Sequence, residues 1–194
     1  AKVHVVENLG IGMSELIVDT LRMRPDRVVI GEVRNIEEVA AFMDTLLAGQ
    51  GKGSYATFHS RNANEAIARL RKLGVNEIDI PAIDIIIVQK RWNKIANGRT
   101  SGEERHTTEI CEVSENDGRV ELNKLFEFSF ESKRIVKKNE STKLSEKIMN
   151  SFGIDRPMMK KELGKRRKWL EKKSGQQIAM QEFFGEVNDW QCEN

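Results

Sequence analysis

The chain has 194 residues and a mass of 22.2 kDa, which suits one domain of ordinary size or a compact domain with an appendage. Its 32 Lys and Arg residues nearly balance 30 Asp and Glu residues, so the formal net charge of +2 gives no reason to expect a nucleic acid as partner. The longest apolar stretch, residues 83–88, contains Asp84 and is far shorter than the ~20 residues of a membrane-spanning helix.

The two cysteines indicate the cellular compartment of the protein, and the first residue indicates whether the chain is part of a longer one. Cys111 and Cys192 are far apart and have neither CxxC spacing nor a neighbouring His cluster. This argues against a disulfide scaffold or a zinc site and indicates a reducing, cytoplasmic compartment. The chain begins with Ala1 rather than Met and carries no basic and apolar leader, so we expect it to be a piece of a longer protein.

The first half of the sequence alternates between helical and extended patterns. Ser14 is a candidate N-cap, and Asn62 with Glu65 three positions later resembles a capping pair. Residues 27–33 form the β-branched apolar run of a strand buried on both faces. A helix between two such strands normally joins them in parallel, so we expect an α/β architecture. The predicted elements are a helix from Ser14 to Met23, a strand over 27–33, a helix over 36–47, a strand over 54–58, a helix ending at Gly74 and a strand over 83–92.

The second half changes to an alternating pattern over residues 105–130, with a hairpin turn expected at Asn116, Asp117 and Gly118. A polar, Lys-rich linker follows, and then apolar residues at helical spacing. The chain is thereby divided into a partial α/β core over 1–104, a small antiparallel β extension over 105–131, and a charged linker with a helical C-terminal tail over 132–194. The helical spacing is carried by Leu144, Ile148, Met149, Met158, Leu163, Leu170 and residues 178–187.

Glu32 and His59 are the first candidates for chemistry. Glu32 interrupts an apolar strand at its carboxyl end, and His59 directly follows the next predicted strand. Open α/β sheets bind ligands outside the carboxyl ends of their strands, and parallel strands would bring both side chains to the same rim. A carboxylate and an imidazole there could orient a water, hold Mg²⁺ through its water shell or sense a phosphate. The structural alternatives are a Glu that pairs with an Arg and a His that only packs.

Four arginines, Arg22, Arg24, Arg27 and Arg34, flank the same strand. A forked guanidinium matches phosphate oxygens, but ion pairs with nearby carboxylates are the plainer interpretation, which we favour for Arg27. The segment 49–53 contains three glycines and Lys52 but lacks the GxxxxGK[ST] spacing of a phosphate loop. A helix stop followed by a strand is the better interpretation of that segment.

Eight Lys and Arg residues lie around Trp169 within residues 160–173. They could contact acidic lipid or a partner protein, although such a run is more often a solvated helix face. If this helix packs Met158, Leu163 and Leu170 on the α/β core, its basic face is exposed.

Two segments, LRMRPDRVVIGEVRN at 21–35 and GSYATFHSRNANEAIARL at 53–70, resemble the secretion ATPase superfamily of type II secretion, type IV pili and archaeal filaments. The first resembles that family's atypical Walker B region, in which Gly31 and Glu32 end the strand. The second resembles its His box, with Thr57 and His59 in the expected positions. RHTTEICEV at 105–113 and the basic helix at 158–170 are most similar to the archaeal pilus and archaellum branch. Nothing in the chain resembles the family's Walker A loop, Asp box or N-terminal domain.

The resemblance implies a RecA-like P-loop NTPase sheet, of which this chain is the C-terminal part, and ATP hydrolysis with Mg²⁺ in the full-length protein. Glu32 would activate the attacking water or hold it through the Mg²⁺ shell, and His59 would sense the γ-phosphate. Arg34 would tie the strand end to neighbouring charges. The resemblance also implies nucleotide or phosphate contacts by Arg34, Thr57, Arg22 and Arg24. Arg22 and Arg24 are equally compatible with contacts between subunits.

The resemblance further implies a ring-forming, hexameric ATPase at the cytoplasmic face of the cell membrane, beneath a membrane assembly-platform protein. Such a protein powers secretion or the assembly of a pilus or archaellum by converting hydrolysis into domain rotation. This chain, without a phosphate loop, is expected to be inactive by itself. Two alternatives stay open: a stand-alone docking module of such a machine that hydrolyses nothing, and a conjugation-type relative from type IV secretion.

Overall fold

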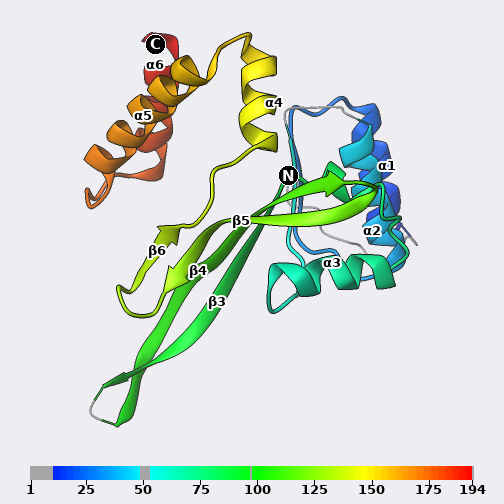
Figure 1. The fold of residues 1–194 in the computed structure, drawn as a ribbon, viewed down its shortest axis with the longest axis horizontal. Helices are drawn as coiled ribbons and strands as arrows, with labels where there is room; N and C mark the ends of the chain where they lie inside the picture. Colours follow the sequence, from blue (N-terminus) through cyan, green and yellow to red (C-terminus); the bar gives the residue numbers. More distant parts are fainter. Residues whose placement is uncertain (1–10, 49–52, 97, 194) are drawn as a thin grey trace. The chain divides into compact units, whose positions relative to one another are not determined.

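The computed structural model describes residues 11–48, 53–96 and 98–193. Within these residues the chain forms two compact units, one up to Leu144 and the other from Ser145 onward (Figure 1). The described strands all belong to the first unit, and the second unit is helical.

The first unit contains a small parallel sheet. β1 (Val28–Ile30) pairs in parallel with β2 (Ser54–Ala56), and α2 (Ile36–Leu47) connects the two strands. α1 (Met13–Arg22) precedes this strand–helix–strand segment, and α3 (Ala63–Lys72) follows it. A 3-10 turn, η1 (Ile80–Ala82), leads to a second sheet. The predicted strand–helix–strand order and its parallel pairing are confirmed.

Apolar side chains from these elements form one core, but only one face of β1 contributes to it. Val28 and Ile30 are buried together with Val39 of α2. Val29 alternates to the other face and is 75% exposed, and its paired neighbour Tyr55 is 51% exposed. The prediction that this strand is buried on both faces is therefore wrong. Successive strand residues point to opposite faces, and the described part of the chain covers only one of them.

The helix after β2 begins as its sequence predicts. The Asn62 side chain accepts a hydrogen bond from the Glu65 N–H at 2.8 Å, which satisfies one of the free donors of the first turn of α3. The helix ends after Lys72, and Gly74 follows with a φ of +88°, in the left-handed region that favours glycine. Both the capping pair and the glycine stop are confirmed.

The first helix begins differently from the prediction. Met13 is its first residue and Gly12 is its N-cap, so Ser14 lies inside the helix. The Gly12 N–H donates to Glu15 Oε2 at 3.1 Å, which closes the helix start through the acidic side chain rather than a Ser hydroxyl. The prediction of a Ser14 cap is therefore wrong.

The second sheet is antiparallel and has four strands in the order β3-β4-β5-β6. The turn between β4 and β5 is formed by Asp117 and Gly118, with φ of +50° and +75°, so the predicted hairpin is confirmed. The sheet also includes the strand expected at 83–92, and its last strand lies within the stretch expected to be a linker. Its strands are β3 (Ile85–Ala96), β4 (Arg99–Asn116), β5 (Arg119–Ser129) and β6 (Arg134–Lys137).

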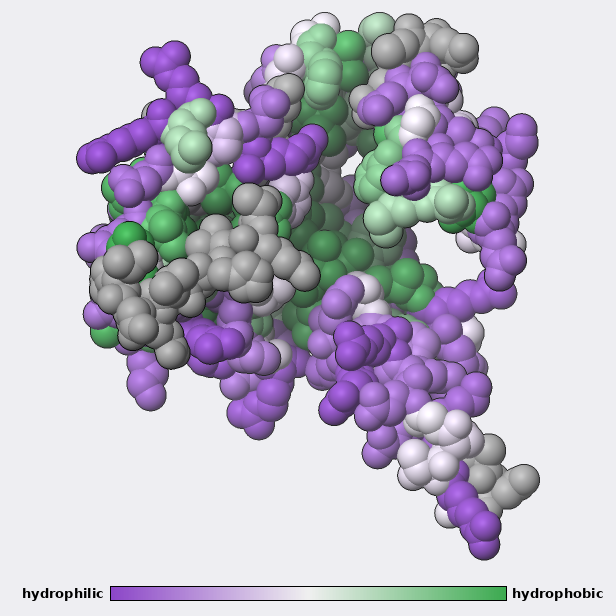
Figure 2. All heavy atoms as spheres, turned by 180° about the vertical axis from the view of Figure 1, so that it is seen from behind, coloured by the Kyte–Doolittle hydropathy of each residue, from purple (hydrophilic) through white to green (hydrophobic). Residues whose placement is uncertain are grey.

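The distal part of β3 and β4 extends as a hairpin beyond the other strands (Figure 1). Cross-strand ion pairs join Arg91 to Glu103 at 3.3 Å and Lys94 to Glu104 at 3.1 Å. Figure 2 shows hydrophilic residues over the visible face of this hairpin. One sheet face nevertheless carries a ring cluster in which centroids lie 4.9 to 5.6 Å apart; it consists of Trp92, His106, Phe128 and Phe130.

The second unit is built from three helices, as the helical spacing predicts: α4 (Lys143–Phe152), which begins at the end of the first unit, α5 (Arg156–Lys173) and α6 (Met180–Glu193). Trp169 of α5 contacts Phe183 and Trp190 of α6, with ring centroids 5.7 and 6.2 Å apart. No helix in the described part of the chain has the length and apolarity needed to cross a membrane.

The apolar residues of α5 differ in exposure. Met158, Leu163 and Leu170 are each about half exposed, whereas Met159 is buried. The packing of this helix on the α/β core stays a prediction. Leu163 and Leu170, seven residues apart, lie on one face of the helix, whereas Met158, five residues before Leu163, lies off that face.

Candidate functional site

The candidate site lies where the two parallel strands end. Glu32 stands two residues after β1, and His59 three residues after β2. Because β1 and β2 are parallel, both segments leave the sheet at the same edge, and Glu32 Oε1 lies 2.7 Å from His59 Nε2. The expected meeting of these two side chains is confirmed.

Arg34 completes the contacts of the Glu32 carboxylate. Its Nε donates to Glu32 Oε2 at 2.6 Å, and its Nη2 contacts the same oxygen. The Arg34 main-chain N–H donates in turn to Glu38 Oε2 at 2.7 Å, which anchors the segment after β1 to the first turn of α2. The Arg34 hydrogen bond is the main reason why the pKa of Glu32 lies below its usual value. Glu32 is thus held as a charged carboxylate with each oxygen engaged.

Thr57 joins the two segments through the main chain. Its hydroxyl donates to the Gly31 carbonyl, and the Val33 N–H donates to the Thr57 carbonyl at 3.0 Å. These bonds continue the strand pairing past the ends of β1 and β2. They fix the spacing of the segments that carry Glu32 and His59.

The two central side chains differ in exposure. The Glu32 side chain is 21% exposed and the His59 side chain 83% exposed. A molecule that approaches this edge therefore meets the imidazole first, with the carboxylate behind it. Such an arrangement can orient a water or contact an anionic group that lies against the sheet edge.

The described residues of this site offer one carboxylate as a ligand for Mg²⁺, so its other ligands would have to come from a bound phosphate and from water. A carboxylate is the hard oxygen donor that Mg²⁺ prefers, and Glu32 supplies one. The described residues hold no group of three or more His, Cys, Asp or Glu side chains that could enclose a metal ion. Mg²⁺ held mainly by phosphate and water, with Glu32 acting through one of those waters, agrees with this donor set.

Three of the flanking arginines do not converge on Glu32. Arg22 lies at the end of α1, where its Nη1 is 3.4 Å from Asp19 Oδ1. Arg27 donates from Nη1 to the Tyr55 hydroxyl at 3.0 Å, a contact with a phenol rather than with a carboxylate. Arg24 has a φ of +51° in the turn before β1. The glycine segment lies outside the described residues except for Gly53.

The structure adds one residue that the sequence pattern does not single out. Arg69 of α3 donates from Nη1 to the main-chain carbonyl of His59, and its Cζ lies 4.9 Å from the centre of the Phe58 ring. Its position four residues after Glu65 suggests only a helical ion pair. A bond to a main-chain carbonyl leaves no trace in the sequence, so this contact required the structure.

Comparison with known proteins identifies the family. The family model described as "Type II/IV secretion system protein" matches residues 1–172. A Mycobacterium tuberculosis protein named for conjugal transfer is 32% identical over 118 residues, which are 60% of this chain and 33% of that protein. The type IV pilus assembly ATPase PilB of Acinetobacter baylyi is 30% identical over 97 residues, covering 50% of this chain and 16% of PilB. An uncharacterized protein of Methanocaldococcus jannaschii is 25% identical over 186 residues, covering 95% of this chain and 67% of that protein.

The chain belongs to the family of type II/IV secretion system proteins, because that family's model covers most of its length. The resemblance recognised from the segments around Glu32 and His59 is confirmed. The chain spans about a third of the length of the M. tuberculosis relative.

Proposed function

We propose that this chain is the C-terminal part of an ATPase that powers protein secretion or the assembly of a type IV pilus-like filament. The observation that carries the proposal is the contact of 2.7 Å between Glu32 and His59 at the carboxyl edge of two parallel strands. Family membership and the similarity to PilB, which is named as an ATPase, support it. In this proposal residues 1–104 correspond to part of a RecA-like core, and 105–131 and 132–194 to its β extension and helical tail.

The proposed chemistry assigns different tasks to the two central side chains. Glu32, held charged by Arg34, orients the attacking water through its carboxylate or through a water of the Mg²⁺ shell. His59, the more exposed of the two, contacts the γ-phosphate of ATP. Mg²⁺ neutralises phosphate charge when it is bound. Thr57, Arg22 and Arg24 are further proposed contacts of the nucleotide, and the two arginines could instead serve a neighbouring subunit.

The full-length protein is proposed to work as a hexameric ring at the cytoplasmic face of the membrane, against an assembly-platform protein and without nucleic acid. The M. jannaschii relative, which matches 95% of this chain, supports an assignment to the archaeal branch. The M. tuberculosis relative supports the second candidate function, that of a conjugation-type ATPase in type IV secretion. A stand-alone docking module is the non-catalytic alternative.

The experiment that tests this function is Glu32→Gln in the full-length protein. The substitution keeps the size of the side chain and removes its charge, so nucleotide should still bind while turnover falls roughly 10²- to 10⁴-fold. Glu37→Gln, an exposed carboxylate change in the first turn of α2, is the matched control and should leave turnover unchanged.

His59→Ala gives the second readout. It should lower turnover with a smaller effect on nucleotide affinity, because a γ-phosphate contact acts mainly on the hydrolysis-competent state. Turnover per folded molecule and nucleotide binding are measured on the same samples, with circular dichroism to count folded protein. Near-normal hydrolysis by folded Glu32→Gln would remove Glu32 from the catalytic role and favour the docking module.

A further inference from the structure

Arg69 is placed to control the position of His59. Its guanidinium donates to the His59 carbonyl and lies over the Phe58 ring, so it contacts the two residues that directly precede the loop to α3. The His59 side chain is 83% exposed, and its Nε2 lies 2.7 Å from Glu32 Oε1. Arg69 itself is only partly exposed on a helix that is buried along Ala66, Ile67 and Leu70.

We infer that Arg69 is a positioning residue for His59, an inference that rests on the proposed function. A planar guanidinium can donate to a carbonyl and stack on a ring at the same time, whereas an ammonium group lacks the planar stacking surface. Arg69 thereby ties the end of β2 to the rigid helix α3. A shift of about 1 Å in a reacting geometry is enough to cost roughly 10²-fold in rate.

The test in the full-length protein compares Arg69→Met with Arg69→Lys and with Lys72→Met. Lys72 is an exposed residue of the same helix and serves as control. We expect Arg69→Met to lower kcat roughly 10- to 100-fold with little change in KM for ATP, Arg69→Lys to recover part of the loss, and Lys72→Met to leave both constants unchanged. An unchanged kcat in folded Arg69→Met overturns the inference.

A second measurement separates this inference from the proposed function. The 194-residue chain has only three histidines, so NMR of ¹³C-labelled histidine can follow His59 beside His106. Arg69→Met should shift the His59 signals and leave those of His106 in place. Unchanged His59 signals would overturn the positioning role while the function stands. Shifted signals together with normal hydrolysis by Glu32→Gln would support the contact while the proposed function fails.

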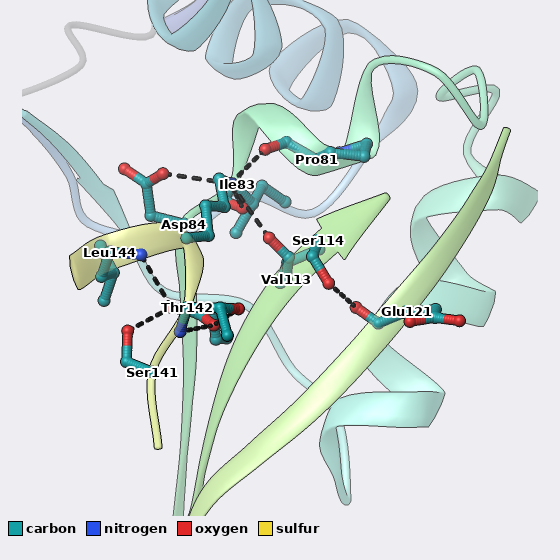
Figure 3. Close-up of polar contacts among 11 residues, drawn as sticks. Pro81, Ile83, Asp84, Val113, Ser114, Glu121, Ser141, Thr142 and Leu144 are labelled. Carbon is teal, nitrogen blue, oxygen red and sulfur yellow. Dashed lines mark hydrogen bonds and ion pairs between the residues drawn. The ribbon is translucent and has the colours of Figure 1, made fainter. Parts of the chain in front are cut away.

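A different part of the first unit carries a second, independent inference. Glu112 of β4 is fully buried, and its carboxylate accepts hydrogen bonds from the segment 141–144. Figure 3 labels Ser141, Thr142 and Leu144 of this segment. Oε1 accepts from the Ser141 hydroxyl at 2.5 Å and from the Leu144 N–H at 2.8 Å. Oε2 accepts from the N–H and the hydroxyl of Thr142 at 3.0 and 3.1 Å and from Asn123 Nδ2 at 3.4 Å.

Lys143 lies in the same segment and points into an array of oxygens. Its Nζ donates to the carbonyls of Pro81, Ile83 and Val113 at 2.5, 3.1 and 3.0 Å. It also lies 3.1 Å from Asp84 Oδ1. An ammonium group has three protons to donate, and this array offers an acceptor for each of them.

We propose that Glu112 and Lys143 form a clasp that holds residues 141–144 against the rest of the first unit. These residues end the first compact unit, and Ser145 begins the second. Composition alone predicts a polar, Lys-rich linker that reaches Lys143. Glu112 of β4 accepts from N–H groups and hydroxyls of the segment. Carbonyls of η1, of Ile83 and of β4 accept from the Lys143 ammonium.

Hydrogen exchange of the Thr142 and Leu144 amides in the 194-residue chain tests the clasp. Both amides should be protected in the wild type, and Glu112→Gln or Lys143→Met should speed their exchange at least tenfold while amides of α2 and α3 keep their rates. Glu131→Gln and Lys90→Met, changes at exposed residues of the same sheet region, should leave all rates unchanged. Fast exchange at 142 and 144 in the wild type overturns the proposal even if a clasp variant fails to fold.

Discussion

At the scale of single residues, the charge state of Glu32 limits what it can do. Arg34 keeps the pKa of this carboxyl below its usual value, which makes Glu32 a poorer proton acceptor than an unpaired carboxylate. A permanent negative charge, on the other hand, is suited to orienting a water or a hydrated cation. Within the proposed function, orientation is therefore the favoured role of Glu32, and the proton of the attacking water needs another acceptor.

Removal of Arg34 should raise the pKa of Glu32. In Arg34→Met the carboxyl loses the hydrogen bond and the charge that lower its pKa, so it should protonate at a higher pH. The acid limb of turnover against pH in the full-length protein should then move to higher pH. Carboxyl ¹³C titration measures the pKa directly. Arg61→Met is the matched control, because Arg61 acts on Glu65 and not on Glu32; an unchanged Glu32 titration in Arg34→Met would contradict the argument.

The central pair and Arg34 could be predicted from sequence, whereas the contacts of Arg69 and Glu112 could not. Parallel strands bring their carboxyl ends together, so the positions of Glu32 and His59 followed from the order of the elements. Arg69 acts on a main-chain carbonyl, and Glu112 is one of several glutamates in an alternating strand. Neither position differs in pattern from an ordinary surface residue. Tertiary contacts between distant segments decide both.

At the scale of elements, the attachment of residues 141–144 to β4 should weaken at acidic pH. Burial raises the pKa of Glu112, but hydrogen bonds from Leu144, Ser141, Thr142 and Asn123 outweigh it and lower the pKa from 4.5 to about 2. A lowered pKa in the folded state adds stability above the unfolded value and loses it as the pH falls from about 4.5 toward 2. The shift corresponds to about 3 kcal/mol.

Urea unfolding of wild type and Glu112→Gln at pH 7, 4 and 3 checks this dependence. The variant should be less stable at pH 7 and should lose less stability on acidification. Some acid dependence should persist, because Glu77 also has a pKa of about 2 through its bonds to Arg71 and the Val120 N–H. Glu131→Gln should reproduce the wild-type curve. Parallel curves for wild type and Glu112→Gln would show that the Glu112 carboxylate does not stabilise the fold.

The basic helix α5 offers a comparison of two cations with different surroundings. Arg166 lies 3.4 Å from Glu162, and its Cζ is 5.3 Å from the Trp190 ring, whereas Lys168 is exposed on the same helix. Arg166→Gln should lower the free energy of unfolding by roughly 0.5–1 kcal/mol, and Lys168→Gln by less than about 0.5 kcal/mol. Urea unfolding measures both. A large loss in Lys168→Gln would show that this charge is paired or buried.

Local patterns predicted the type of most elements but not their burial. Helical spacing and the Asn62 cap located α2 and α3, and the Asp117–Gly118 turn located the β4–β5 hairpin. Whether an apolar residue is buried depends on which other segments pack over it. Val29 and Leu163 are apolar and remain exposed. The sequence of a strand or helix alone does not predict which of its faces another element packs against.

At the scale of the whole molecule, the proposed site is only part of what ATP hydrolysis needs. Glu32 and His59 stand at one edge of the parallel sheet, and the chain spans a third of the M. tuberculosis relative. Binding of a nucleoside triphosphate in such folds depends on main-chain N–H groups of a Gly-rich loop at a helix N-terminus and on a Lys at the β- and γ-phosphates. The 194 residues contain no GxxxxGK[ST] segment.

The chain by itself should therefore bind Mg-ATP weakly. Single side chains such as His59 and Arg34 can contact a phosphate, but an exposed charge contributes little against solvent and salt. Calorimetric titration of the 194-residue chain with Mg-ATP should give a Kd of about 1 mM or weaker, which corresponds to about −4 kcal/mol. The full-length protein, titrated under the same conditions, is the control and should bind more tightly. A micromolar Kd for the chain alone would show that its own residues hold the triphosphate, and Arg22, Arg24 and Thr57 would be the first positions to substitute.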